Sequence, residues 1–305
     1  MRWLVRVVAA LPWWALYRLS DVLGWLMQWV GYRRTVITEN LARAFPEKSA
    51  AARKALQRAF YRHLADVMME VMKAFRMGRD ELCRRVSVAE SRAYSMLVER
   101  GGIIITGHLG NWEWAGLRVG LDLDFPHYVV YLPLKSRTSD RLMRSLRERF
   151  GNEAVPVKRI TRLLLGRRER RFAASFLADQ NPPPPDIQAW YSFFGRKVPV
   201  HMGPERLARR LDVPVYWAYA HRTRRGRYVI RFLVVSEEPA SLPPGEVMRR
   251  YVAQLEETIR HHPEQWLWSH RRWKLSPPDE KAAAVMKNDT TAEKGRGTQI
   301  AKDEG

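Results

Sequence analysis

The sequence predicts an α/β fold in which helices flank an open mixed sheet, with a membrane-associated helical segment at the N-terminus. Short β-branched apolar runs alternate with helical patterns in the middle of the chain, and an aromatic-rich segment precedes them. With 305 residues, 46% of them hydrophobic, the chain has enough apolar side chains for a substantial core. We expect a membrane-anchoring segment over 1–34, an α/β domain over 35–275 and a disordered tail over 276–305, where large apolar residues nearly disappear.

The first segment, from Trp3 to Tyr32, is rich in Trp, Leu and Val. Charged residues and a proline interrupt it before any run reaches the roughly 20 apolar residues of a membrane-spanning helix. Its aromatic side chains are of the kind found at headgroup depth, and Arg33 and Arg34 close the segment with positive charge. We therefore expect it to associate with a membrane, and the alternative is a pair of ordinary core helices. The aromatic residues are Trp3, Trp13, Trp14, Tyr17, Trp25, Trp29 and Tyr32.

Helical periodicity continues over 35–79, with a break at Pro46 and a new start near Ala50. Strands and helices then alternate, a pattern typical of an α/β sheet whose ligands gather at strand ends. The expected strands are 103–106, 127–132, 172–177, 213–220 and 228–235, and the expected later helices are 139–150, 204–211 and 244–262.

The stretch GGIIITGHLGNWE at 101–113 carries the most specific chemical signal. An apolar strand leads into a glycine-containing turn with His108, and Asn111 is a suitable N-cap for a helix whose first turn holds Glu113. A neutral imidazole can take the proton of a hydroxyl that attacks an acyl carbonyl, while a carboxylate fixes the tautomer of the ring. We therefore predict a catalytic pair of His108 and Glu113. The alternative is that His108 satisfies a backbone carbonyl and Glu113 is solvated.

The charge balance predicts an anionic partner. Lys and Arg number 53 and Asp and Glu 32, so the net charge is +21. No zinc-finger, RNP-like or helix-turn-helix signature accompanies this charge, so we expect a membrane surface or an acidic protein rather than nucleic acid. The basic stretch 158–171 is the candidate docking surface, and the alternative is an ordinary solvated face.

No cofactor or metal is expected. Cys83 is the single cysteine, which excludes an intramolecular disulfide and a multi-cysteine metal site. The histidines lack ligand spacing, and neither a phosphate-loop nor a dinucleotide glycine pattern occurs.

Four stretches in a fixed order are similar to bacterial lipid A late acyltransferases of the lauroyl or myristoyl type, within the lysophospholipid acyltransferase superfamily. They are GHLGNWE at 107–113, YLPLK at 131–135, ADQNP at 178–182 with FFG at 193–195, and PEQWLWSHRRWK at 263–274. Glu39 to Leu41 and Phe45-Pro46 also fit, so the resemblance covers nearly everything except the tail.

The resemblance implies transfer of a fatty acyl chain to a hydroxyl of a lipid A precursor, at the cytoplasmic face of the inner membrane. The donor would be a thioester of acyl carrier protein or coenzyme A, which is a co-substrate and not a cofactor. On this interpretation His108 is the base and Glu113 its partner. The implied partners are acyl carrier protein, the lipid acceptor and the anionic membrane surface. The alternatives are a glycerophospholipid or aminolipid acceptor, or a non-catalytic basic lipid-binding protein.

Six further residues are candidates for binding substrate. Similar proteins usually carry Arg or Lys where this chain has Leu132, and a basic residue nearby would replace that charge. Two polar residues end a predicted strand before four prolines. They would position the acceptor, or else form hydrogen bonds with backbone groups of a rigid loop. An arginine among the tryptophans of 263–274 matches phosphate geometry, although the same stretch could be a packed helix end. The six are Asn111, Lys135, Arg137, Asp179, Gln180 and Arg271.

Phe193 and Phe194 have two interpretations that the sequence leaves open. They would line a tunnel for the acyl chain, or they would pack in the core as adjacent aromatic residues commonly do.

Overall fold

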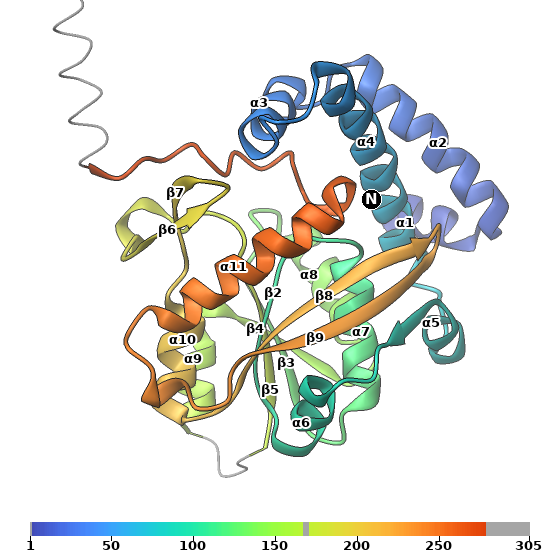
Figure 1. The fold of residues 1–305 in the computed structure, drawn as a ribbon. Coiled ribbons are helices and arrows are strands. Elements are labelled where there is room, and N and C mark those ends of the chain that lie inside the picture. The colour runs from blue at the N-terminus through green and yellow to red at the C-terminus, as the bar shows by residue number, and fades with distance from the viewer. Residues whose placement is uncertain (1, 167–170, 279–305) are drawn as a thin grey trace, which may run out of the picture.

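Seven strands form one mixed sheet with helices on both faces (Figure 1). This computed structural model describes residues 2–166 and 171–278. The strand order is β1-β9-β8-β2-β5-β3-β4, and β6 and β7 form a separate hairpin. The strands are β1 (Val86–Val88), β2 (Gly102–Thr106), β3 (His127–Tyr131), β4 (Asn152–Pro156), β5 (Ala173–Leu177), β6 (Trp190–Phe193), β7 (Arg196–Pro199), β8 (Val215–Arg224) and β9 (Arg227–Ser236).

Strands β8, β2, β5, β3 and β4 run parallel, whereas β9 is antiparallel to β8 and β1 is parallel to β9. The predicted open mixed α/β sheet is therefore confirmed. The helices are α1 (Arg2–Ala10), α2 (Trp13–Trp29), α3 (Arg34–Ala44), α4 (Ala50–Lys73), α5 (Arg79–Arg85), α6 (Arg92–Arg100), α7 (Trp112–Asp122), α8 (Arg137–Arg147), α9 (Val157–Leu165), α10 (Gly203–Leu211) and α11 (Glu246–His261).

The central strand β2 shows why the sheet needs helices on both faces. Ile103 and Ile105 are fully buried in a core that includes residues of α4, α9, α10 and α11. Ile104 is buried in a second core with residues of α5, α6, α7 and α8. Since successive side chains of a strand point to opposite faces, a continuous run of isoleucines is stable only when both faces are covered.

The N-terminal helices pack against the rest of the molecule through α4. Leu16 of α2 and Val8 of α1 are buried together with Met69 of α4. Large side chains remain on the outside of α2, where Trp14 is 74% exposed and Trp29 is 71% exposed. Within 2–166 and 171–278, no helix is both long enough and apolar enough to cross a membrane.

The sequence located most elements but missed several short ones. The strands expected at 103–106, 127–132, 172–177, 213–220 and 228–235 correspond to β2, β3, β5, β8 and β9. Strands β1 and β4 and the β6–β7 hairpin are absent from the prediction, because runs of three to five residues without a clear apolar alternation carry little signal. Of the tail expected over 276–305, residues 279–305 lie outside the described residues. Residues 167–170 of the basic stretch 158–171 also lie outside them.

The turn after β2 depends on Gly110, which has a φ of +62°. A Cβ atom at this position would overlap the carbonyl oxygen of Ala220 in β8. Glycine is thus required both by its backbone conformation and by the close approach of a neighbouring strand.

We predict that Gly110→Ala lowers the free energy of unfolding by at least about 2 kcal/mol, because a left-handed backbone costs roughly 1–2 kcal/mol for a residue with a Cβ and the clash adds to it. Thermal denaturation should show a fall in Tm of about 4 °C or more. The control is Gly203→Ala at the start of α10, where an added Cβ has open space. Equal Tm values for the two variants would contradict the prediction.

Candidate active site

His108 lies in the turn after β2 and forms a pair with Asp179, which follows β5. Its ring atom Nδ1 lies 2.8 Å from Asp179 Oδ1, and its backbone N–H donates to Asp179 Oδ2 at 2.9 Å. The two residues meet because β2 and β5 are adjacent parallel strands, whose carboxyl ends lie at the same edge of the sheet. The His108 side chain is 18% exposed and that of Asp179 is 1% exposed, so the ring is accessible and its carboxylate partner is not.

Asp179 is held in its ionised form. Burial alone would raise its pKa, but the charge of the His108 ring and hydrogen bonds from His108 and Trp266 outweigh burial and lower the pKa to about 2. Trp266 Nε1 donates to Asp179 Oδ2 at 2.9 Å. An ionised carboxylate only accepts, so Nδ1 of His108 carries the proton and Nε2 of the neutral ring is left as a base. Among the described residues Nε2 has no hydrogen-bond partner.

Glu113 does not orient His108, which corrects the predicted pairing. The Glu113 carboxylate instead accepts two hydrogen bonds from Arg147 of α8, from Nε at 3.0 Å and from Nη2 at 2.6 Å. Glu113 lies in the first turn of α7, as predicted. Asn111 is the N-cap of α7, and its Oδ1 accepts a hydrogen bond from the N–H of Trp114 at 3.0 Å. The carboxylate beside Nδ1 of His108 is that of Asp179. We predicted from the sequence that Asp179 lies at a strand end, but as a substrate-binding residue.

The C-terminal segment holds the His108 turn from the other side. Leu267 N–H donates to the carbonyl of His108 at 3.0 Å, and Gly110 N–H donates to the carbonyl of Gln265 at 3.0 Å. Leu109 and Trp266 form an isolated antiparallel bridge between these hydrogen bonds. The turn is thus fixed by main-chain pairing as well as by Asp179, which restricts the position of the His108 ring.

A cavity of about 60 Å³ lies between α7 and the sheet. The ring of Trp112 lines it and also contacts His108, with ring centroids 4.9 Å apart. Glu113 and Arg147 form its charged part, and most of the remaining lining is apolar. Its lining, mostly apolar with one charged pair, has the composition of a ligand site, and its volume equals that of about two water molecules. The apolar lining includes Ile104, Leu117, Val119, Val129, Val130, Leu177 and Ile230.

The model of the bacterial lipid A biosynthesis acyltransferase family matches residues 2–275. The chain belongs to this family. No curated protein matches it. The protein is therefore an acyltransferase, and the match covers the N-terminal helices, the sheet and the C-terminal segment that pairs with the His108 turn.

In this acyltransferase, the six residues predicted to bind substrate differ in exposure and in their contacts. Asn111 is completely buried and Asp179 nearly so, and both use their side chains to hold the turn. Their role in substrate binding stays a prediction. Gln180 is partly buried, with Nε2 3.4 Å from Nδ1 of His108, so it lies beside the His108 ring.

The three basic candidates are all exposed. Lys135 and Arg137 follow β3, at the same edge of the sheet as His108, because β3 is parallel to β5. Leu132, the position where similar proteins carry a basic residue, is 70% exposed beside them. Arg271 lies in the C-terminal segment, where its carbonyl accepts from Nδ2 of Asn181. All three remain accessible to an anionic substrate.

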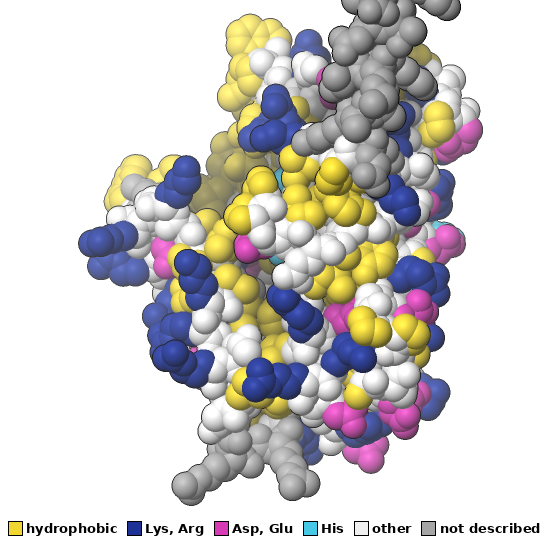
Figure 2. Space-filling view, turned by 90° about the vertical axis from the view of Figure 1, so that its left-hand side faces the viewer, with side chains coloured by type: hydrophobic (Ala, Val, Ile, Leu, Met, Phe, Trp, Pro, Cys, Tyr) yellow, Lys and Arg dark blue, Asp and Glu magenta, His cyan; other side chains and the backbone are white. Residues whose placement is uncertain are grey.

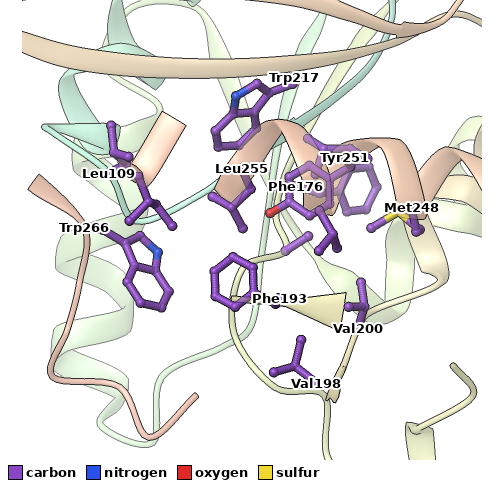
Figure 3. Packing of buried hydrophobic residues seen from close by; sticks show 14 of the residues in the cluster. Leu109, Phe176, Phe193, Val198, Val200, Trp217, Met248, Tyr251, Leu255 and Trp266 are labelled. Carbon is purple, nitrogen blue, oxygen red and sulfur yellow. The ribbon is translucent and has the colours of Figure 1, made fainter. Parts of the chain in front are cut away.

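The aromatic residues of the later motifs form core. Phe193 is completely buried and packs near Trp266 (Figure 3). The centroid of its ring lies 5.7 Å from that of Trp266 and 5.7 Å from that of Trp273. Of the two interpretations of Phe193 and Phe194, core packing is the one that the structure supports. Arg272 is also buried, with 1% of its surface exposed, so this arginine is not free to grip a lipid phosphate.

Within the described parts of the chain, no three His, Cys, Asp or Glu side chains are placed to hold a metal ion.

We predict that Asp179→Asn lowers the free energy of unfolding by about 2 kcal/mol at pH 7, since a buried carboxylate that accepts three hydrogen bonds loses its charge. The lowered pKa of Asp179 stabilises the fold fully above its unfolded pKa of about 4. This contribution is lost as the pH falls through the folded value of about 2. The stability difference between wild type and Asp179→Asn should therefore shrink between pH 4 and pH 2, as measured by denaturant unfolding.

The matched control is Asp124→Asn, which neutralises a carboxylate whose side chain is 71% exposed. It should change stability by less than about 0.5 kcal/mol across the same range. A pH-independent difference for Asp179→Asn would contradict the assignment of an ionised Asp179.

Proposed function

We propose that this acyltransferase transfers a fatty acyl chain from an acyl thioester to a hydroxyl of a lipid A precursor, with His108 as the general base. The observation that carries the proposal is the pair formed by His108 and the buried Asp179, which leaves Nε2 of the accessible ring without a partner. A base of this kind activates a hydroxyl directly, so no covalent enzyme intermediate is required.

The proposed reaction has two steps. The acceptor hydroxyl gives its proton to Nε2 of His108 while its oxygen attacks the thioester carbonyl, forming a tetrahedral oxyanion. The C–S bond then breaks, the thiolate leaves and takes the proton from the imidazolium, and the ester remains on the acceptor. Asp179 stabilises the imidazolium throughout, because its carboxylate lies 2.8 Å from the ring.

Arg147 and Glu113 are proposed to act together at the oxyanion. Arg147 is the basic residue that lines the cavity within the described chain, and its two hydrogen bonds to Glu113 fix its guanidinium. A pre-oriented cation near the developing negative charge lowers the barrier without reorganisation. Glu113 thereby keeps a place in the catalytic site as the residue that holds Arg147.

The donor is proposed to be acyl carrier protein or coenzyme A, both of which carry negative charge. Several exposed basic residues of α8 and α9 have no ion-pair partner among the described residues, unlike Arg144, so their charge is available. In Figure 2, Lys and Arg side chains lie among hydrophobic ones on the face that is drawn. Such a surface attracts an acidic protein or an anionic lipid headgroup. The available residues are Arg137, Arg141, Lys158, Arg159 and Arg162.

We also propose that α1 and α2 lie on the cytoplasmic face of the inner membrane. The exposed tryptophans of α2 and the arginines that follow it combine apolar contact area with positive charge. This combination is typical of a helix that binds at the headgroup level. The acceptor lipid would then enter the site from the membrane.

The test of this function is acyl transfer by the purified protein in detergent. Acyl carrier protein and coenzyme A thioesters are supplied in turn with lipid A precursors, glycerophospholipids and aminolipids, and mass spectrometry detects the acylated product. We expect a mass gain on a lipid A precursor. A gain on another lipid, or none with any acceptor, would contradict the proposal.

His108→Ala should lower kcat by about 10³-fold or more, because a general base contributes about 10²–10⁴-fold and its loss also leaves Asp179 without its partner. Binding to vesicles that contain anionic lipid should be unchanged, since His108 lies outside α1 and α2, the helices proposed to contact lipid. Near-normal turnover by His108→Ala would exclude this mechanism.

A second prediction concerns the length of the acyl chain. Gly116 lines the apolar cavity, and a Cβ atom there has open space around it. Gly116→Leu should therefore fill the cavity and shift the preference towards shorter acyl thioesters, by about fourfold in kcat/KM for each methylene excluded. Gly116→Ala, which adds one methyl group, should give a smaller shift in the same direction. An unchanged preference in both variants would show that the acyl chain binds elsewhere.

A further inference from the structure

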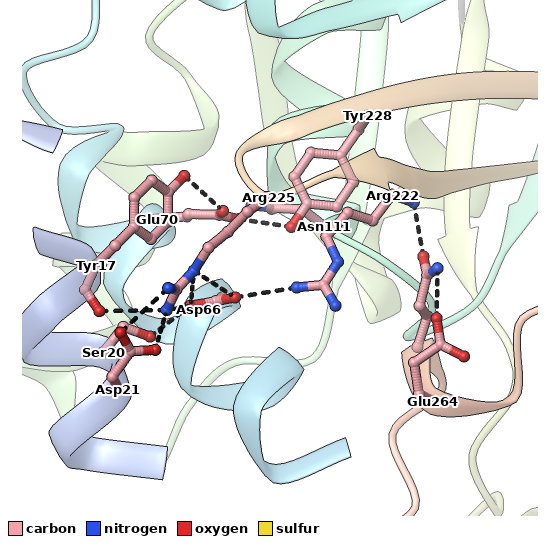
Figure 4. Close-up of polar contacts among 11 residues, drawn as sticks. Tyr17, Ser20, Asp21, Asp66, Glu70, Asn111, Arg222, Arg225, Tyr228 and Glu264 are labelled. Atoms are coloured by element: carbon pink, nitrogen blue, oxygen red, sulfur yellow. Dashed lines mark hydrogen bonds and ion pairs between the residues drawn. The ribbon is translucent and has the colours of Figure 1, made fainter. Parts of the chain in front are cut away.

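Glu70 is a buried carboxylate in the last turn of α4 that has no cationic partner among the described residues. Its side chain is completely buried, and no ion pair involves it within the described parts of the chain. It accepts instead from three neutral donors, Tyr17 Oη at 3.1 Å, Asn111 Nδ2 at 2.9 Å and Tyr228 Oη at 2.7 Å (Figure 4). Burial raises the pKa of Glu70 to about 7, although the hydrogen bonds from Tyr228 and Asn111 oppose this rise.

Two contacts of Glu70 hold the start of α7, immediately after the His108 turn. The Asn111 side chain is divided between two tasks, because Oδ1 caps α7 while Nδ2 donates to Glu70. Trp114 Nε1 donates to the backbone carbonyl of Glu70 at 3.0 Å. The first turn of α7 is thus fastened to α4 at two points, three and six residues after His108.

The third donor comes from the N-terminal helix α2. Tyr17 stacks on Trp13 of the same helix at a centroid distance of 5.7 Å, and Trp13 meets the edge of Trp114 at 6.0 Å. The outer side of α2 exposes Trp14 and Trp29. One face of α2 therefore contacts the support of the catalytic turn, while the other is open to the surroundings.

Asp66, one helical turn before Glu70, provides a contrast. It forms ion pairs with Arg222 at 3.0 Å and with Arg225 at 2.6 Å, and Ser20 donates to it at 2.6 Å (Figure 4). Asp66 thus ties α2 and the β8–β9 turn to α4 through ion pairs. Glu70 is a costly buried carboxylate without that compensation, and one of its donors is Asn111, three residues after His108.

We propose that Glu70 is a positioning residue for acyl transfer, and that the contact of Tyr17 with it makes the packing of α2 part of the support of the catalytic turn. The inference rests on the proposed role of His108 and extends it to the N-terminal helices. On this proposal α2 affects catalysis as well as contacting lipid. A shift of α2 would move Tyr17 and the Glu70 carboxylate, and through Glu70 it would move Asn111 and the His108 turn.

The test uses the full-length protein with Tyr17→Phe and Asn111→Ser. Tyr17→Phe removes one hydroxyl and keeps the ring, and Asn111→Ser keeps an N-cap residue that is too short to reach Glu70. Each should lower kcat about tenfold with KM for the thioester changed less than twofold, since the loss is one of positioning and not of binding.

Tyr94→Phe is the matched control, because Tyr94 donates to Asp122 at 2.6 Å near the far end of α7. It removes the same kind of tyrosine–carboxylate hydrogen bond, here between α6 and α7 and away from the His108 turn. We expect its Tm to match that of Tyr17→Phe within about 2 °C while its kcat stays within twofold of wild type.

A readout that needs no turnover is the rate at which diethyl pyrocarbonate modifies His108, followed by peptide mass spectrometry. We expect this rate to rise at least threefold in Tyr17→Phe and Asn111→Ser and to be unchanged in Tyr94→Phe. Equal rates and equal kcat values in all three variants would overturn the positioning role. If wild type transfers no acyl group but the modification rates differ as expected, the proposed function fails while the support of the His108 turn by Glu70 and Tyr17 stands.

Discussion

The contact between the ring of His108 and the carboxylate of Asp179 is the interaction on which the rest of the active site depends. It joins residues 71 positions apart, and only the parallel pairing of β2 with β5 brings them together. The Asp179 carboxylate is buried while the His108 ring is accessible, and both lie at one edge of the sheet. Burying a charge in this way is costly, so Asp179 is surrounded by donors that keep it ionised.

The C-terminal segment contributes to the stabilisation of the buried Asp179 carboxylate. Trp266 donates to Asp179 while the neighbouring residues pair with the main chain of the His108 turn. The tryptophans of this segment then pack on Phe193 and seal the region from water. The motif at 263–274 thus supports the His108 turn, and some of its residues, such as Arg271, are exposed.

Three carboxylates near the turn have three different roles because their surroundings differ. Asp179 is paired with a titratable ring, Glu113 with the permanent cation of Arg147, and Glu70 with neutral donors alone. The first sets the tautomer of His108, the second fixes a positive charge in the cavity, and the third links the turn to α2. Asp179 and Glu70 reach the turn by hydrogen bonds, through His108 and Asn111 respectively.

The sequence by itself determined what depends on neighbouring residues. The β2 strand, the glycine turn, the Asn111 cap and the position of His108 follow from local propensities, and so do the exposed aromatics of α2. The tertiary structure alone decided which carboxylate meets His108, that Arg147 takes Glu113, and that Arg272 is buried beside exposed Arg271. The physical reason is that these contacts join distant segments, and strand order and helix packing, which no local pattern encodes, bring those segments together.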